Sequence, residues 1–206
     1  MRLGLITAAI FLAVGACTPG AELPTSPVSA AMPPVEARRG EVGDVFVWQH
    51  QDGSQRWVKV IAQTATEITL ESETGCTRRV RRDGFAPATE WRQCGGASGS
   101  HTAERITPSI LPLAHGRSER WRFSGTNSDG DEWDGVRTCS VVGAASVTVP
   151  AGIFDTHHVR CENPWLVYEW FVRADGVTVQ WARTAKTGSR DQNRLARLVR
   201  FTPAPN

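Results

Sequence analysis

The chain has 206 residues, of which 40% are hydrophobic and 21% charged, and its 23 basic and 21 acidic side chains give a formal net charge of +2. This length fits one domain or two small ones, and the composition excludes a disordered tail, a fibrous repeat and a membrane protein with several spans. A net charge so close to zero gives no electrostatic reason to expect nucleic acid as a partner.

The N-terminus is typical of a secretory signal. Met1 and Arg2 precede an apolar stretch over residues 3–16, which is too short to cross a bilayer as a helix. The stretch ends in Val14-Gly15-Ala16-Cys17, which resembles the bacterial lipobox. The resemblance implies that residues 1–16 are a signal peptide and that the Cys17 thiol carries a lipid anchor. The alternative is an ordinary secretory signal that leaves Cys17 unmodified.

Residues 17–40 are predicted to be a lipidated cysteine followed by a tether. Thr18 stands where many enterobacterial lipoproteins retained at the inner membrane have aspartate, so the resemblance implies the periplasmic face of the outer membrane. Five of the twelve prolines fall in this segment, and proline disfavours both helices and strand pairing. We therefore expect an extended spacer that holds the folded part away from the membrane.

The rest of the chain is predicted to be all-β. In a first block, residues 41–95, strands at 45–48 and 56–61 flank Asp52-Gly53, a dipeptide that favours a tight hairpin turn, and a third strand follows at 66–70. Residues 96–116 are rich in Gly, Ser and Pro, which predicts a connection without strands.

A second block, residues 117–206, is predicted to continue the β structure. Alternating apolar residues predict strands at 121–123, 136–142, 146–149, 153–161, 165–173 and 177–183. Residues 194–201 favour a closing strand, with a helix as the alternative. We expect antiparallel meanders that form a sandwich or a partly open barrel. The two blocks are either copies of one duplicated unit or unrelated meanders that look alike.

Four cysteines remain once Cys17 is set aside, and an even number in an oxidising compartment predicts two disulfides. Three connectivities are possible. We favour Cys76–Cys94 and Cys139–Cys161, one within each block, each worth about 3 kcal/mol by constraining the unfolded chain. A zinc site is the weaker alternative, because the sequence has no C-x₂-C pair.

Residues 147–156 read Val-Thr-Val-Pro-Ala-Gly-Ile-Phe-Asp-Thr, which resembles the V-x-V-P-A-G-x-F-[DE]-[TA] signature of an uncharacterised β-rich family of secreted bacterial proteins. The later run 168–171 before Gly176 is similar to the aromatic strand and turn of that family. The resemblance covers residues 115–202 and implies a fold, but it brings no catalytic residues. In physical terms Pro150 ends a strand, Gly152 permits a positive φ, and Phe154 returns to the sheet.

Candidates for chemistry are few, and each has a structural alternative. His157-His158 with Glu162 suggests a metal, but adjacent residues on a strand point to opposite faces. Residues 127–135 resemble a Ca²⁺ loop, yet Thr138 replaces the bidentate glutamate, so a hairpin turn is expected. Residues 98–101 place serines beside a histidine without an orienting carboxylate. We predict no metal, no cofactor and no catalytic residue.

Eight tryptophans against one tyrosine are unusual. Those within aromatic strands are expected in the core, and those near loops are candidates for binding a glycan or peptide. The core group is Trp48, Trp121 and Trp170, and the binding candidates are Trp91, Trp133 and Trp165. Four arginines at 78, 79, 81 and 82 form either a basic patch for anionic lipid or glycan, or a solvent-facing strand.

These observations predict a lipid-anchored envelope protein with a non-catalytic β domain that binds or supports a periplasmic or cell-wall partner. An envelope protein or peptidoglycan is the expected partner. The alternative function is an envelope hydrolase whose active-site residues are too scattered to be recognised in the sequence.

Overall fold

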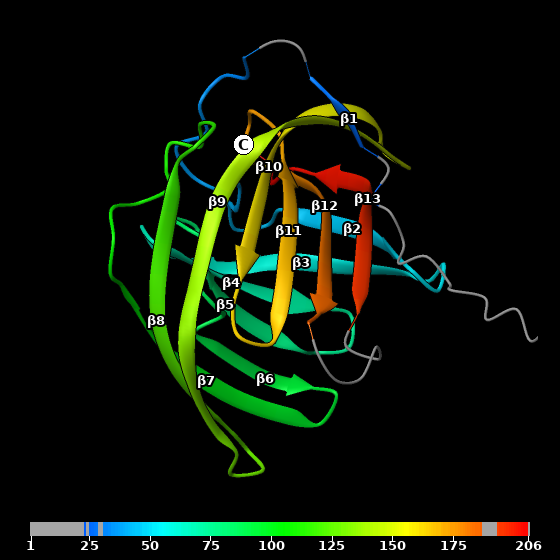
Figure 1. Ribbon diagram of the computed structural model, residues 1–206. Helices are drawn as coiled ribbons and strands as arrows, with labels where there is room; N and C mark the ends of the chain where they lie inside the picture. Colours follow the sequence, from blue (N-terminus) through cyan, green and yellow to red (C-terminus); the bar gives the residue numbers. More distant parts are fainter. Residues whose placement is uncertain (1–22, 24, 29–30, 187–192, 206) are drawn as a thin grey trace, which may run out of the picture.

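The computed structural model describes residues 23, 25–28, 31–186 and 193–205, so the predicted signal peptide and Cys17 lie outside the described residues. The described residues form thirteen strands and no helix (Figure 1). The strands are β1 Thr25–Pro27, β2 Val45–His50, β3 Gln55–Gln63, β4 Glu67–Ser72, β5 Thr77–Arg81, β6 Glu90–Cys94, β7 Ala97–Arg105, β8 Ser118–Asn127, β9 Glu132–Val149, β10 Gly152–Glu162, β11 Leu166–Val172, β12 Thr178–Ala185 and β13 Arg194–Thr202.

Strands β2 to β13 close into one antiparallel barrel. Neighbours in the sequence pair with one another and β13 pairs with β2, so the two predicted blocks are joined through β7, which pairs with β6 and β8, and through the β13–β2 pairing. The all-β prediction is confirmed, but the sandwich alternative is wrong, because a closed barrel satisfies the strand edges that a sandwich leaves open. In the part of the chain that the structure describes, no helix is long and apolar enough to cross a membrane.

The turns predicted at glycines are confirmed, because these glycines adopt the positive φ that other residues rarely adopt. Gly53 has φ 81° in the β2–β3 turn, and Gly152 has φ 136° directly after the turn that follows Val149. Phe154 lies in β10, as the Pro-Ala-Gly segment predicted. Residues 194–202 form strand β13 and not the alternative helix.

Two predictions about strand boundaries are wrong. Residues 96–116, expected to be a connection, contain β7, which pairs with β6 and with β8. Its sequence lacks large apolar residues: its inward positions include Ala103 and Gly99, and at Gly99 the Trp91 ring leaves no space for a side chain. The predicted strands at 136–142 and 146–149 are one strand, β9, in which a register shift opposite His158 and Val159 absorbs the break in alternation.

The two disulfides in the structure have the connectivity that we favoured. Cys76–Cys94 joins the start of the β5 hairpin to the end of β6. Cys139 and Cys161 lie directly opposite each other on β9 and β10, and both are fully buried. Each disulfide therefore ties together strands of one block.

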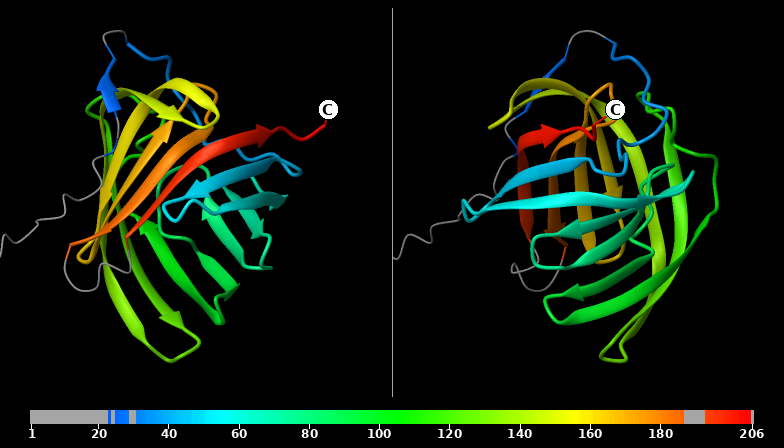
Figure 2. Two further views of the ribbon diagram at one scale, coloured as in Figure 1. Left: turned by 90° about the vertical axis from the view of Figure 1, so that its right-hand side faces the viewer. Right: turned by 180° about the vertical axis from the view of Figure 1, so that it is seen from behind.

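One end of the barrel is covered by the hairpin of β9 and β10, which bends over the strands beneath it (Figures 1 and 2). We call this the hairpin end. Val147 and Val149 share a buried apolar cluster with Leu198 of β13, and the Ala151 N–H donates to the Leu198 carbonyl at 3.0 Å. The opposite end, where the β8–β9 turn lies, is called the aromatic end.

The predicted free tether is wrong for the described residues that precede β2. Val35 is 3% exposed and forms a bridge with Leu113, and the Arg39 N–H donates to the carbonyl of Gly176 at 2.9 Å. A Cβ on Gly176 would lie 2.6 Å from the Ala37 carbonyl oxygen, so this chain passes closely over the β11–β12 turn. Strand β1 pairs with β9. Apolar contact and backbone pairing thus outweigh the preference of proline for extended, unpaired chain.

Glu119 on β8 is fully buried and holds two long loops against the barrel. Its carboxylate accepts the N–H of Phe85 at 2.7 Å and that of Ile110 at 3.4 Å, and it lies 3.4 Å from the Arg105 guanidinium. Phe85 and Ile110 are themselves buried in an apolar cluster with the second disulfide. A single carboxylate therefore fixes two segments that have no strands of their own.

Candidate functional site

The inner face of the barrel carries most of the aromatic side chains that are not fully buried. Strand register places them on the same side as the core residues. They are Trp48, Trp91, Trp133, Tyr168, Trp170 and Trp181, all half-buried, and we call them the aromatic inner face. Of the three tryptophans expected in the core, only Trp121 is completely buried; the other two pack against the apolar clusters while keeping contact with solvent.

At the aromatic end, three rings meet. The centroids of Trp91 and His101 are 5.0 Å apart, those of His101 and Trp133 are 5.5 Å apart, and those of the two tryptophans are 6.1 Å apart. They come from β6, β7 and β9, which lie side by side around the sheet with only β8 between β7 and β9. The tilted and edge-to-face angles between these rings are the favourable arrangements for aromatic pairs.

Two glycines make room for these rings. Gly99 lies directly opposite Trp91, and a Cβ at this position would overlap the Trp91 ring. Gly125 lies between His101 and Trp133, and its Cβ would be 2.5 Å from the imidazole. The rings therefore occupy the space of the missing side chains, and these glycines are required by packing.

Both nitrogens of His101 have hydrogen-bond partners. The Trp133 indole N–H donates to Nε2 at 2.9 Å, and Nδ1 lies 2.7 Å from the Ala88 carbonyl. Because Nε2 accepts, the proton of the neutral ring is on Nδ1 and is donated to that carbonyl. Burial lowers the pKa of His101, which also favours the neutral ring.

This arrangement leaves His101 without a nitrogen to activate a serine. Ser100 precedes it on the same strand and points to the opposite face. The hydroxyl of Ser98 accepts the N–H of Gln93 at 3.2 Å. The serine and histidine types that were adjacent in the sequence therefore do not form a nucleophile and base pair.

Trp165 joins this cluster through Phe123. The Phe123 centroid is 5.6 Å from His101 and 6.3 Å from Trp165, which is 41% exposed. The three tryptophans predicted as binding candidates are thus gathered around His101 and Phe123, two residues that the sequence did not assign to a binding site. Gly99 and Gly125 were the sequence signal for these two residues, because a glycine within a strand often marks a position next to a large ring.

Arginines contribute positive charge to the inner face. Arg78 lies directly opposite Trp91 on the neighbouring strand, and Arg183 lies opposite Tyr168. The side chain of Arg78 is accessible to solvent, yet the protein around it and then the charge of Arg183 lower its pKa. Solvent access together with a lowered pKa is expected for a cation that faces the inside of a barrel. The Arg137 guanidinium stacks over the Tyr168 ring at 4.5 Å.

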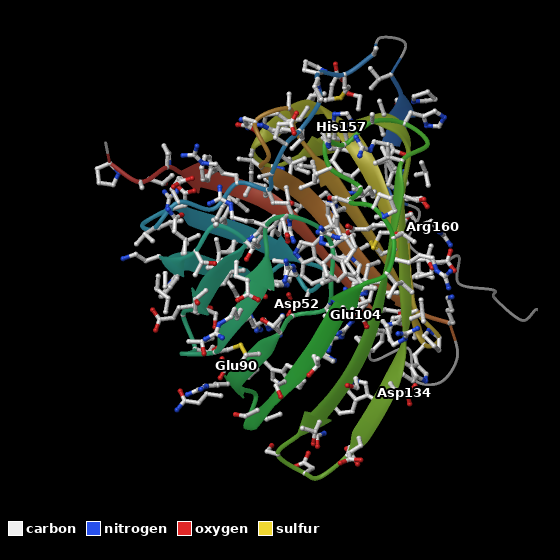
Figure 3. The ribbon with its side chains drawn as sticks, turned by 90° about the vertical axis from the view of Figure 1, so that its left-hand side faces the viewer. Asp52, Glu90, Glu104, Asp134, His157 and Arg160 are labelled. Carbon is white, nitrogen blue, oxygen red and sulfur yellow. A yellow bond between two sulfur atoms is a disulfide. The ribbon has the colours of Figure 1, made fainter. Side chains whose placement is uncertain are left out.

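The outer face beside the aromatic cluster has a shallow depression of about 630 Å³. Strand pairing arranges its polar side chains in two rows across β7, β8 and β9. The rows are Ser100, Thr126 and Glu132, and Thr102, Ser124 and Asp134. Trp133 also lines the depression, so the hydroxyl and carboxylate rows border the aromatic cluster. Figure 3 shows Asp134 on β9 toward this end of the molecule.

The histidine pair on β10 is divided between two environments. His157 is buried, and its Nε2 donates to the Pro33 carbonyl at 2.8 Å. His158 lies 3.0 Å from a carboxylate oxygen of Glu169, while Glu162 pairs with Lys186 at 2.8 Å. Among the described residues, no three His, Cys, Asp or Glu side chains lie close enough to hold a metal ion.

Residues 127–135 form the β8–β9 turn at the aromatic end. The Asn127 side-chain oxygen accepts the N–H groups of Asp129 and Asp131, and its amide donates to the Asp131 carboxylate at 3.0 Å. Asn127 and Asp131, two of the oxygen donors that resembled a Ca²⁺ loop, therefore stabilise a hairpin turn, as the alternative interpretation predicted.

The four arginines of the β5 region do not form one basic patch. Arg78 faces inward, whereas the other three pair with carboxylates. Their distances are 3.2 Å for Arg79–Glu90, 2.7 Å for Arg81–Asp83 and 3.4 Å for Arg82–Glu41. These pairs favour the interpretation of a solvated, ion-paired strand.

Comparison with known proteins identifies the fold. No protein-family model and no curated protein matches the chain, so the resemblance of residues 147–156 to a secreted family gains no further support. The hypothetical lipoprotein YmcC of Escherichia coli K12 is similar in structure, with a TM-score of 0.52 and 11% identity over 79% of this chain and 85% of that one. An exported protein with a YmcC-like fold from Bacteroides fragilis has a TM-score of 0.46 and 10% identity over 82% of this chain and 100% of that one.

Proposed function

We propose that this YmcC-like barrel is a lipid-anchored envelope protein that binds a cell-wall glycan at its aromatic end. In this proposal Cys17 carries the lipid, the protein stands on the periplasmic face of the outer membrane, and the barrel domain catalyses no reaction. The two disulfides support an oxidising compartment, because such bonds persist in the envelope and rarely in the cytosol. The YmcC protein, which shares the fold, is described as a lipoprotein.

The observation that carries the proposed ligand is the gathering of Trp91, Trp133 and Trp165 at one end of the barrel. Tryptophan rings offer large apolar faces for the C–H surface of a sugar, and their partial exposure leaves those faces accessible. The neighbouring rows of hydroxyls and carboxylates both donate and accept hydrogen bonds, as the hydroxyls of a glycan require. Peptidoglycan is the abundant glycan of the proposed compartment.

Binding to isolated peptidoglycan sacculi tests this proposal. We expect the purified domain to sediment with sacculi and Trp165→Ala to weaken binding about tenfold, the effect of losing about 1.4 kcal/mol at a contact residue. Trp57→Ala is the matched control, because Trp57 is 37% exposed but belongs to β3, outside the cluster. An equal loss in both variants, or no sedimentation of the wild-type protein, would contradict the proposal.

The anchor is tested separately by mass spectrometry and fractionation. We expect the N-terminal peptide to begin with an acylated Cys17, and Cys17→Ser to release the protein from the membrane fraction. Several acyl chains, each contributing about 0.8 kcal/mol per buried CH₂, hold a protein stably, so their loss has a large effect. An unmodified Cys17 in membrane-bound protein would show that something else retains it.

A further inference from the structure

The tip of the β9–β10 hairpin carries no charged side chain. No charged residue occurs between Arg137 and Asp155, a stretch that includes the upper part of β9, the turn and the start of β10. At this turn Ile153 is 71% exposed, the largest exposed fraction of any large hydrophobic side chain in the described residues. Thr148 lies directly opposite it and is also exposed.

Strand β1 ties the N-terminal segment to the same end. Thr25, Ser26 and Pro27 pair with Val147, Ser146 and Ala145 on the edge of β9. These β1 residues are also uncharged, so the paired residues of β1, β9 and β10 at this end carry one charge, that of the exposed Asp155 opposite Ser146. Their position at the end of the barrel opposite the β8–β9 turn is visible in Figure 1, and Figure 3 shows His157 toward the hairpin end and Asp134 toward the aromatic end.

The pairing of β1 limits how far the barrel can stand from the lipid. Cys17 precedes Thr25 by eight residues, and a fully extended chain of that length spans at most about 29 Å. A lipid on Cys17 therefore keeps this end close to the bilayer, at a high effective concentration that favours even a weak contact. The spacer predicted over residues 17–40 would have imposed no such limit.

We infer that the β9–β10 hairpin rests on the bilayer interface with Ile153 inserted among the lipids, an inference that depends on the lipid anchor at Cys17 proposed above. The uncharged residues between Arg137 and Asp155 lose little hydration at the interface, and the projecting isoleucine gains apolar contact there. The aromatic end then faces away from the membrane, toward the cell wall. The hairpin thus orients the proposed glycan site.

A fluorescent label at Thr148 tests the contact while retaining Ile153. The variant Thr148→Cys is labelled with an environment-sensitive fluorophore while the native disulfides stay oxidised, and the lipidated full chain is placed in phosphatidylethanolamine and phosphatidylglycerol vesicles. Spin-labelled lipids are expected to quench this label. The same label at Asp129→Cys, in the β8–β9 turn at the opposite end, is expected to keep its intensity.

A second substitution separates membrane contact from mere proximity. In the Thr148→Cys background, Ile153→Glu is expected to abolish most of the quenching while the protein still floats with the vesicles, because the anchor remains. Equal quenching at positions 148 and 129, or quenching that Ile153→Glu leaves unchanged, would overturn the inference and leave the anchor intact. Failure of the wild-type protein to float would instead overturn the anchor, and the inference with it.

Discussion

At the residue scale, His101 illustrates how packing determines chemistry. The ring is held between Trp91 and Trp133, receives a hydrogen bond from an indole and donates one to a backbone carbonyl. Every polar group of the side chain is satisfied by a group that cannot take part in proton transfer at neutral pH. His101 therefore positions the tryptophans, and its own reactivity is low.

We expect His101 to make the stability of the protein depend on pH. Burial lowers its pKa below the ordinary value of about 6.5, so the unfolded chain takes up a proton at a higher pH than the folded chain does. The free energy of unfolding therefore falls as the pH drops below about 6.5. Thermal unfolding between about pH 7.5 and about pH 5.5 should show this fall, above the range in which carboxylates titrate.

The variant His101→Gln keeps a donor and an acceptor but does not titrate, so it should reduce this dependence. His50 also has a pKa lowered by burial, and His50→Gln is expected to remove a separate part of the effect. A pH profile of unfolding that is identical in the wild-type protein and His101→Gln would show that the imidazole does not contribute.

Glu119 is predicted to contribute strongly to stability through its contacts with the two loops. Glu119→Ala removes the acceptor of two buried N–H groups and the partner of Arg105, and should lower the free energy of unfolding by about 3–5 kcal/mol. Glu104→Ala, an exposed residue paired with Arg122 on the barrel surface, is the control and should cost less than about 1 kcal/mol. Denaturant unfolding measures both, and similar losses would contradict the proposed role.

At the scale of elements, pairing and packing with neighbouring segments decide which parts of the chain are stably folded. β7 exists because β6 and β8 pair with it on both sides, although its own sequence has weak strand propensity. The segment before β2 is ordered because Val35 fills a buried position beside Leu113. In both cases the neighbours supply the stability that the local sequence lacks.

The segment containing Val35 should behave as part of the barrel. Val35→Ala is expected to destabilise the protein by about 1–3 kcal/mol, the value of burying a valine side chain. Val42→Ala makes the same substitution at a position that is 50% exposed and should change stability by less than about 0.5 kcal/mol. Chemical denaturation distinguishes them, and equal midpoints would mean that the segment behaves as the free tether predicted from its prolines.

The two disulfides should differ in their resistance to reduction. Cys139 and Cys161 are fully buried, whereas Cys76 and Cys94 are half-buried near the surface. Under native conditions a mild thiol reductant should therefore open Cys76–Cys94 first, because the attacking thiolate needs access to sulfur. Alkylation followed by peptide mass analysis identifies the order. Reduction of Cys139–Cys161 first would indicate that the barrel opens between β9 and β10.

At the scale of the whole molecule, the barrel separates the proposed glycan site from the proposed membrane contact. β9 runs from the turn at the aromatic end to the hairpin at the other, so one strand joins the proposed glycan site to the proposed membrane contact (Figure 1). A rigid closed sheet between them keeps the two sites apart. The proposed function therefore needs only an orientation relative to the membrane, which is the role of the proposed membrane contact.

This separation predicts that anchoring and glycan binding are independent. Cys17→Ser should lose its association with membranes yet bind sacculi with an affinity within about twofold of the wild type, because distant sites without shared contacts act additively. Sedimentation with sacculi in the absence of lipid measures the binding. A large loss of affinity in Cys17→Ser would show that the N-terminal segment reaches the glycan site.

Much of the fold was predictable where residue type limits the backbone. Glycine in the turns and apolar alternation in β2, β3 and β4 gave the all-β class, and the cysteine count gave two disulfides. The candidate tryptophans were also recognised, but their meeting was not, since β6 and β9 are distant in the sequence. His101 was considered for chemistry beside the serines and was not chosen, but its packing role was missed because the sequence does not show which rings share its face of the sheet.

The sequence by itself determined the β class, the turns and the candidates for anchoring, crosslinking and binding, because each depends on the properties of single residues or near neighbours. Only the tertiary structure decided that the sheet closes, that the chain before β2 packs against it, and that Trp91, Trp133 and Trp165 share one end. The physical reason is that closure is the long-range pairing of β13 with β2, whose stability comes from contacts between distant segments.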